Sequence, residues 1–140
     1  MNTLAIRAAL VIPFLLSVVV GGWNQLFPES FYTTFPTVDL NPPFSEHFAR
    51  DFGGATLAVA LVLGLALVKP KTHYVVPAAG AFSLFAVPHF FFHLFGTHPP
   101  VMWQAIVLTT ANALVALLGL AAILLALLRD RRGSVGGGSR

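Results

Sequence analysis

The longest uncharged stretch of the chain covers residues 72–128 and reads THYVVPAAGAFSLFAVPHFFFHLFGTHPPVMWQAIVLTTANALVALLGLAAILLALL. These 57 residues contain no Asp, Glu, Lys or Arg, and a second uncharged run covers residues 8–28. About 25% of the residues in a soluble domain are charged, whereas only 9% are charged in this chain. The sequence therefore predicts an integral membrane protein whose surroundings are the lipid bilayer rather than water.

Two breaks divide the apolar part of the chain into helices. Glycine and a Pro-Pro pair interrupt the uncharged stretch at residues 96–100, and Pro70 lies between two lysines; both patterns end helices. A membrane-spanning helix needs roughly 20 mostly apolar residues. The spacing predicts four such helices, at residues 3–25, 46–68, 73–96 and 101–128. We expect an all-α, four-transmembrane-helix bundle within residues 1–130, with an uncleaved first helix and a flexible Gly/Ser-rich tail at 131–140.

The charged residues divide between the two sets of helix ends. Seven of the eight cations fall at one set: Arg7, Lys69, Lys71, Arg129, Arg131, Arg132 and Arg140. Four of the five anions fall at the other set: Glu29, Asp39, Glu46 and Asp51. By the positive-inside rule, we expect a multi-pass protein of the plasma membrane with both termini in the cytoplasm.

The predicted outer loop between the first two helices is rich in aromatic residues and proline. Its aromatic residues are Phe27, Phe31, Tyr32, Phe35 and Phe44. Aromatic side chains of this kind gather at the membrane–water interface. Two interpretations follow: the loop folds over the outer end of the bundle as a lid, or it is an interfacial anchor.

Ionisable residues gather where the second predicted helix begins. At about 100° per residue, Glu46, His47, Arg50 and Asp51 share one face of that helix. Glu46 and Arg50 are four residues apart, as are His47 and Asp51, so each pair is close enough to interact. Ionisable residues within membrane spans are costly and usually functional. This face is therefore a candidate site.

The third predicted helix carries His89 and His93 on one face near its outer end. Because the second and third helices run antiparallel, these histidines are expected in the same membrane layer as the ionisable face of the second helix. On the fourth helix, Gln104 is expected in that layer and Asn112 deeper in the membrane. Trp23 and Phe92 complete the predicted lining of a pocket.

Three interpretations of this cluster remain open. The first is a metal site or a haem site, with His47, His89 and His93 as ligands and Glu46 or Asp51 as a carboxylate ligand or orienting partner. Nitrogen and oxygen donors without sulfur suit zinc, copper, iron or manganese. The second is a structural network in which Arg50 pairs with Glu46 or Asp51. The third is a pocket for a lipid, a quinone or protons.

Other features narrow the functional class. The chain has no cysteine, which excludes disulfides, thiolate metal sites and a cysteine nucleophile. It has no Walker motif, dinucleotide-binding glycine loop or Ser-His-Asp arrangement, so we expect a non-enzymatic protein. Its composition excludes nucleic-acid binding. The alternative to a binding protein is an accessory subunit in a larger membrane complex, in which the polar cluster is a structural network. The chain is also expected to form a homo-oligomer or to join such a complex.

Three segments of the chain together resemble a known group of proteins. They are PESFYTTFP at 28–36, EHFARDFG at 46–53 and PHFFFH at 88–93. These segments are similar to those of small four-helix integral membrane proteins of actinobacterial type, loosely DoxX-like and largely of unknown function. The resemblance covers about residues 1–130 and implies that the polar cluster is a shared feature of that group, without implying an activity. The chain departs from the group at residues 42–45, where Pro-Pro-Phe-Ser replaces Gly-Pro-Tyr-Asn.

Overall fold

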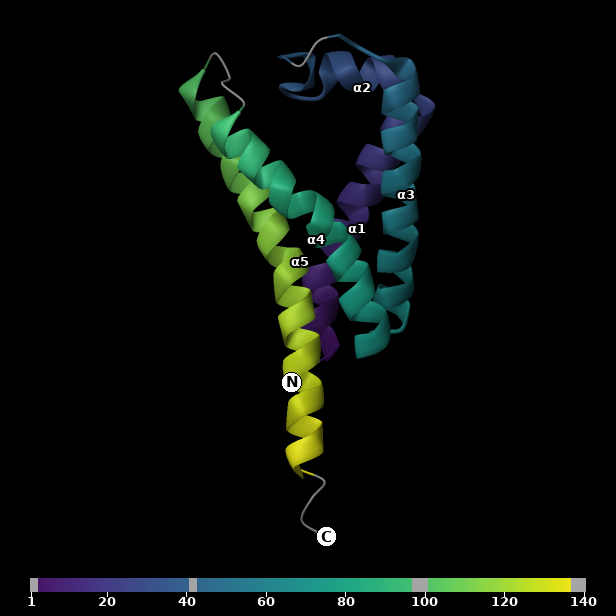
Figure 1. Ribbon diagram of the computed structural model, residues 1–140, viewed down its shortest axis with the longest axis vertical. Helices are drawn as coiled ribbons and strands as arrows, with labels where there is room; N and C mark the ends of the chain where they lie inside the picture. Colours follow the sequence, from purple (N-terminus) through teal and green to yellow (C-terminus); the bar gives the residue numbers. More distant parts are fainter. Residues whose placement is uncertain (1–2, 41–42, 97–100, 137–140) are drawn as a thin grey trace.

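The computed structural model describes residues 3–40, 43–96 and 101–136. The described part of the chain is helical and contains no strand (Figure 1). Its elements are α1 (Thr3–Leu26), α2 (Pro28–Thr34), the 3-10 helix η1 (Val38–Leu40), α3 (Glu46–Val68), α4 (Thr72–Phe95) and α5 (Met102–Gly136).

Four of these helices, α1, α3, α4 and α5, are long and apolar enough to cross a membrane. The shortest has 23 residues, which corresponds to about 35 Å at 1.5 Å per residue. The hydrocarbon core of a bilayer is about 30 Å thick. Within the described residues, the prediction of an all-α architecture with four long apolar helices is confirmed, and each of the four is long enough to span a bilayer.

The last helix is longer than the sequence predicts. It continues to Gly136, so residues 131–136, which we expected to be part of a flexible tail, are helical. Adding residues to a helix that already exists avoids the cost of nucleation, and Arg131 and Arg132 are good helix formers. The expected flexibility of residues 137–140 concerns positions outside the described residues.

The long helices associate in two pairs. The most extensive contacts join α1 to α3 and α4 to α5, with fewer contacts between the pairs. Figure 1 shows that the two pairs lie together at the end where α1 begins and α5 ends, and diverge toward the other end. We call these the closed end and the open end of the bundle.

The buried core extends from the closed end to the middle of the bundle. Ile6, Leu10, Leu63 and Val75 are the largest apolar side chains that are completely buried. Alanines fill most of the remaining positions and allow the helices to approach closely, as is typical of packing within membranes. The full core consists of Ile6, Ala9, Leu10, Leu63, Ala66, Val75, Ala78, Ala79, Phe82, Ala86, Ala116, Ala122 and Ala126.

Two arginines tie the closed end together by donating to backbone carbonyls. Arg7 of α1 donates from Nε to the carbonyl of Leu67 at 3.1 Å and from Nη2 to the carbonyl of Val68 at 3.4 Å. Arg129 of α5 donates from Nη1 to the carbonyl of Pro70 at 2.6 Å. The last carbonyls of a helix have no partner within the helix. The two cations therefore bind α1 and α5 to the same turn between α3 and α4.

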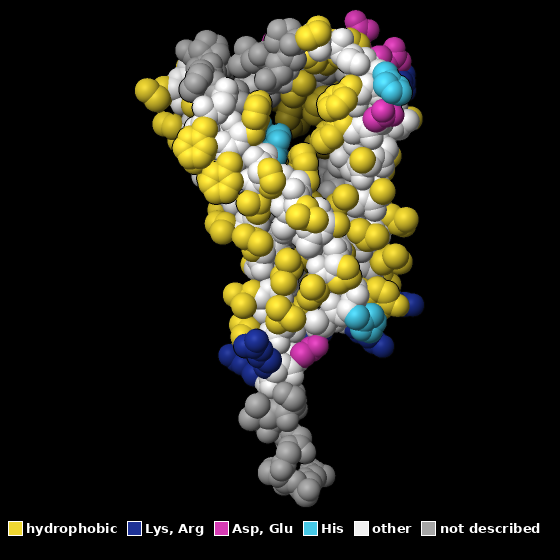
Figure 2. Space-filling view, viewed as in Figure 1, with side chains coloured by type: hydrophobic (Ala, Val, Ile, Leu, Met, Phe, Trp, Pro, Cys, Tyr) yellow, Lys and Arg dark blue, Asp and Glu magenta, His cyan; other side chains and the backbone are white. Residues whose placement is uncertain are grey.

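At the open end, the described residues of the two helix pairs form no comparable core. Within the described residues, none of α4 beyond Ala86 and none of α5 before Ala116 is buried. Figure 2 shows a hollow at this end, with apolar and histidine side chains around it. On the α1–α3 side, burial continues as far as Asn24 and Gly53.

The short helix α2 lies across the open end and packs against α1 and α3 (Figure 1). An aromatic cluster connects it to α1: the Trp23 ring lies edge-on to Phe31, with centroids 5.6 Å apart, and Phe31 stacks on Phe35 at 4.7 Å. Trp23 Nε1 also donates to Ser30 Oγ at 3.2 Å. The segment that we expected only as an aromatic loop therefore contains a short helix fixed to the end of α1.

Candidate functional site at the open end

The side of α4 that is buried at the closed end is only half-buried at the open end. Val75, Phe82 and Ala86 mark the buried side. At about 100° per residue, His89 and His93 each lie within roughly 20° of Phe82 around the helix axis. Both histidines are half-buried. They continue the core-facing side of α4 into the region where the helix pairs diverge.

The two histidines are part of a chain of ring contacts. The rings of His89 and His93 meet edge to face, with centroids 4.5 Å apart. Phe85, one turn earlier in α4, stacks on His89 at 4.9 Å. Phe52 of α3 lies 5.6 Å from Phe85. This last contact crosses from one helix pair to the other, one turn before His89 along α4.

The predicted polar residues of α5 lie on its core-facing side as well. Taking Gly119 as the centre of that side and using about 100° per residue, Asn112 falls within roughly 20° and Gln104 within roughly 60°. Both side chains are half-buried. Phe92 of α4, which we expected in the pocket lining, has an exposed fraction of 52%. The two diverging helices α4 and α5 thus present His, Gln and Asn where the closed end presents Val, Phe and Ala.

The ionisable residues of α3 form two separate pairs. Arg50 Nη2 lies 2.8 Å from Glu46 Oε1, and His47 Nε2 lies 3.2 Å from Asp51 Oδ2. The side chains of His47 and Asp51 are 89% and 65% exposed. The second pair therefore lies on the outer surface of the helix.

Arg50 has a second contact that joins two helices. Its Nη1 donates to the backbone carbonyl of Gln25, near the end of α1. The Arg50 side chain is therefore held by Glu46 and donates to a carbonyl near the end of α1, where the last carbonyls have no partner within the helix. This contact supports a structural role for Arg50 in holding α1 to α3.

The structure does not bring the predicted metal ligands together. Among the described residues, no group of three or more His, Cys, Asp or Glu side chains is placed to hold a metal ion. His89 and His93 form one pair on α4, while His47 and Asp51 form another on the exposed side of α3. The sequence predicts that the two groups lie at the same depth in the membrane, but it does not predict the direction in which each helix face points. Trp23 packs against α2 instead of joining either pair.

Sequence reasoning missed the aromatic contacts that border the histidines. Neither Phe52 nor Phe85 was among the predicted site residues. The spacing offers one signal, because Phe85 precedes His89 by four residues and stacks on it. No pattern in the sequence indicates that Phe52 and Phe85 meet across the two helix pairs.

Comparisons of the chain with protein-family models, with curated proteins and with solved structures gave no match. The resemblance to DoxX-like proteins therefore stays a prediction from the sequence.

Proposed function

We propose that the protein binds a small amphipathic molecule of the membrane, a lipid or an isoprenoid quinone, in the hollow at the open end. The observation that carries this proposal is the half-buried pair of His89 and His93 on the core-facing side of α4, beside the stacked ring of Phe85. The pair lies where the two helix pairs separate. Among the described residues of this region, α4 has no buried residue beyond Ala86 and α5 has none before Ala116.

The chemistry of these residues favours an amphipathic ligand. Polar groups within a bilayer need hydrogen-bond partners, and acyl chains supply none. Imidazole nitrogens, the Gln104 amide and the Asn112 amide would bind the carbonyl, hydroxyl or phosphate oxygens of a ligand head. Phe52, Phe85 and the apolar surface of the bundle would accommodate its chain or ring. Binding sites of this kind are mostly apolar, with a few polar groups that orient the ligand.

The charge distribution supports a plasma-membrane protein with its open end outside the cell. The closed end carries Arg7 and the basic residues at 69–71 and 129–132, with Asp130 as its single acid, and the open end carries the other four acids. In this orientation both termini are cytoplasmic. A cysteine at position 34 should react with a membrane-impermeant thiol reagent in intact cells, and one at position 69 should react only after lysis. The reverse pattern would contradict the orientation.

The ligand is tested by identifying what purifies with the protein. The wild type and a His89→Ala/His93→Ala variant are isolated in mild detergent, and bound lipids and quinones are extracted and quantified by mass spectrometry. We expect a ligand near one per chain in the wild type. Loss of its hydrogen bonds in the variant should lower occupancy about tenfold or more at limiting ligand.

His47→Ala is the matched control, because His47 is a histidine at the same end but lies on the exposed side of α3. It should retain the ligand at wild-type occupancy. Equal ligand content in all three proteins would mean that the molecules are ordinary surrounding lipid, and would contradict the proposal. Metal analysis of the same samples distinguishes the alternative. A stoichiometric metal or haem that is lost with His89 and His93 would replace the lipid or quinone proposal with a metal site.

A further inference from the structure

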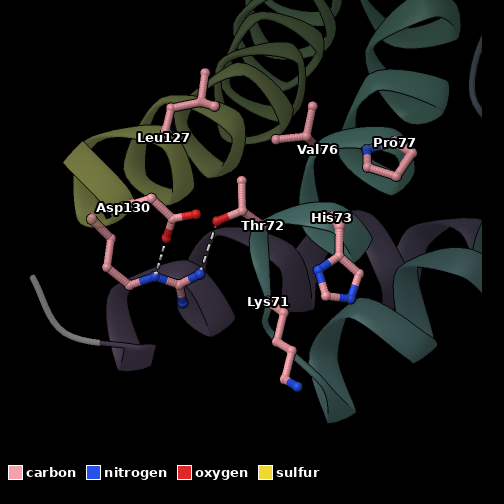
Figure 3. A pocket seen from close by; sticks show the side chains of 8 residues that line it. Lys71, Thr72, His73, Val76, Pro77, Leu127 and Asp130 are labelled. Atoms are coloured by element: carbon pink, nitrogen blue, oxygen red, sulfur yellow. Dashed lines mark hydrogen bonds and ion pairs between the residues drawn. The ribbon is translucent and has the colours of Figure 1, made fainter. Parts of the chain in front are cut away.

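A second candidate binding site lies at the closed end, independent of the hollow. It is a groove of about 620 Å³ between the start of α4 and the last turns of α5. Figure 3 shows the side chains that line it. They are of two kinds, a polar and charged group at Lys71–His73 and Arg129–Asp130 and an apolar group further along the helices toward the middle of the bundle.

The charged part of the groove has a net positive charge. Arg129 is held by Pro70 and by Thr72, whose Oγ1 accepts from Arg129 Nη2 at 3.0 Å. Asp130 is engaged with the same guanidinium, its Oδ1 3.2 Å from Arg129 Nε. Lys71 is exposed, and within the described residues its ammonium has no hydrogen bond or ion pair. Lys71 is therefore the cation in the groove that is available to an anion.

His73 adds a polar ring on the same side as Lys71. Its side chain is exposed, and its ring contacts Tyr74 with centroids 4.4 Å apart. Lys71 immediately precedes α4 and His73 lies in its first turn, at the level where the membrane-spanning part of the helix begins. An imidazole nitrogen and an ammonium at this level suit the oxygens of a phosphate group.

The remaining lining is apolar. Val76 and Pro77 lie one turn further into α4, and Leu127 lies on the facing side of α5. Figure 3 shows these three residues together on one side of Thr72, with Lys71 on the other. The groove thus changes from cationic to apolar along the direction that leads from the membrane surface into the bilayer.

We propose that this groove binds one acidic glycerophospholipid, with its phosphate at Lys71 and His73 and an acyl chain over Val76, Pro77 and Leu127. Basic pockets between membrane helices on the cytoplasmic side suit anionic lipid head groups. The net positive charge of the groove disfavours the quaternary ammonium of a zwitterionic phosphatidylcholine head group. The apolar lining distinguishes a lipid from free phosphate, which has no chain to bury there.

The proposal is tested by native mass spectrometry of the full chain titrated with phosphatidylglycerol or phosphatidylcholine. Lys71→Gln removes the charge without removing a hydrogen bond or ion pair to the described residues. Loss of a charge-assisted contact should weaken binding of the first phosphatidylglycerol about five- to tenfold, with little change for phosphatidylcholine. Lys69→Gln is the matched control, since Lys69 has the same charge in the same turn and does not line the groove. It should bind within about twofold of the wild type.

Equal losses in the two glutamine variants would overturn the proposal, because general surface charge would then explain the preference. A third variant, Val76→Trp, fills the apolar part of the groove and should weaken phosphatidylglycerol binding while Lys71 is intact. Inorganic phosphate is the remaining probe. Binding of phosphate as tight as that of the lipid, and unaffected by Val76→Trp, would identify a phosphate site and contradict the lipid assignment. Circular dichroism and gel filtration establish that each variant is folded.

Discussion

The closed and open ends of the bundle are formed by the same four helices but differ in what their core-facing positions carry. At the closed end, Leu10, Leu63 and Val75 are completely buried. At the open end, the corresponding side of α4 carries His89 and His93, both half-buried. One end therefore buries apolar side chains completely, whereas the other leaves polar side chains of the same helix face only half-buried.

The bilayer explains why such an arrangement is stable. Lipid chains are as apolar as leucine, so no hydrophobic force drives membrane helices together, and close packing of side chains must do so. The alanines and large apolar residues of the closed end supply that packing. At the open end, α1 and α3 are joined to each other and to α2, and α4 and α5 are joined to each other. The pairs diverge where the packing residues between them end.

The largest expected effect comes from breaking the packing of the closed end. Leu10→Ala removes a completely buried side chain and should lower the free energy of unfolding by about 2–4 kcal/mol. Phe85→Ala at the open end removes a larger side chain that is 41% exposed, and we expect a loss of less than about 1.5 kcal/mol because little packing is lost. Unfolding in mixed micelles with increasing dodecyl sulfate measures both changes.

Leu4→Ala is the control for the loss of a leucine from α1, since Leu4 has an exposed fraction of 68%. It should be nearly neutral. A Phe85→Ala variant that is as unstable as Leu10→Ala would show that the open end is as tightly packed as the closed end, and the distinction between the two would be wrong.

A smaller effect is expected from the contact that keeps α1 and α3 together at the open end. A Cβ added at Gly53 would lie 2.6 Å from the backbone nitrogen of Gln25 and 2.8 Å from the carbonyl oxygen of Gly21. Backbone atoms yield only if the helices separate. We expect Gly53→Ala to lower the free energy of unfolding by about 1–3 kcal/mol, despite the better helix propensity of alanine.

Gly54→Ala provides the matched control on the same helix. A Cβ at Gly54 would meet only the flexible Gln25 Oε1, at 3.4 Å, so this variant should be neutral or gain up to about 1 kcal/mol from helix propensity. Equal stabilities of the two variants in the same micelle assay would mean that the α1–α3 contact at the open end contributes nothing.

Most of the fold could be predicted from the sequence because the signals are strong and local. Long apolar runs and Pro-containing breaks place the four long helices, and the observed helices occupy the same regions of the chain. Two local features were not predicted. The short helix α2 begins with Pro28 and is fixed by the ring contacts of Trp23, and the extension of α5 depends on the helix that precedes it.

The candidate site was only partly predictable. The four-residue spacing of His89 and His93 correctly indicates that they share a face. The direction of the His47–Asp51 pair depends on which side of α3 packs against α1, and the sequence does not encode that direction in a recognisable pattern. Glycines at positions 21 and 53 decide it, because the backbones approach closely there. The hollow itself results from the divergence of helix pairs, which is a property of the whole bundle.

The smallest expected effect concerns the contact between α4 and α5 near the limit of the buried core. Within the described residues, the buried Ser83 Oγ has no hydrogen-bond partner, and a Cβ added at Gly119 would lie 2.6 Å from it. Ser83→Ala removes an unsatisfied hydroxyl, so the free energy of unfolding should stay the same or rise by up to about 1 kcal/mol. Gly119→Ala should be better tolerated in that background than in the wild type. A double-mutant cycle in mixed micelles measures the difference.

Gly80→Ala, whose added Cβ would have no neighbour within 4 Å, corrects for helix propensity. Additive effects of the two substitutions would show that α4 and α5 adjust independently at this point, and the open end would then be more deformable than its paired helices suggest.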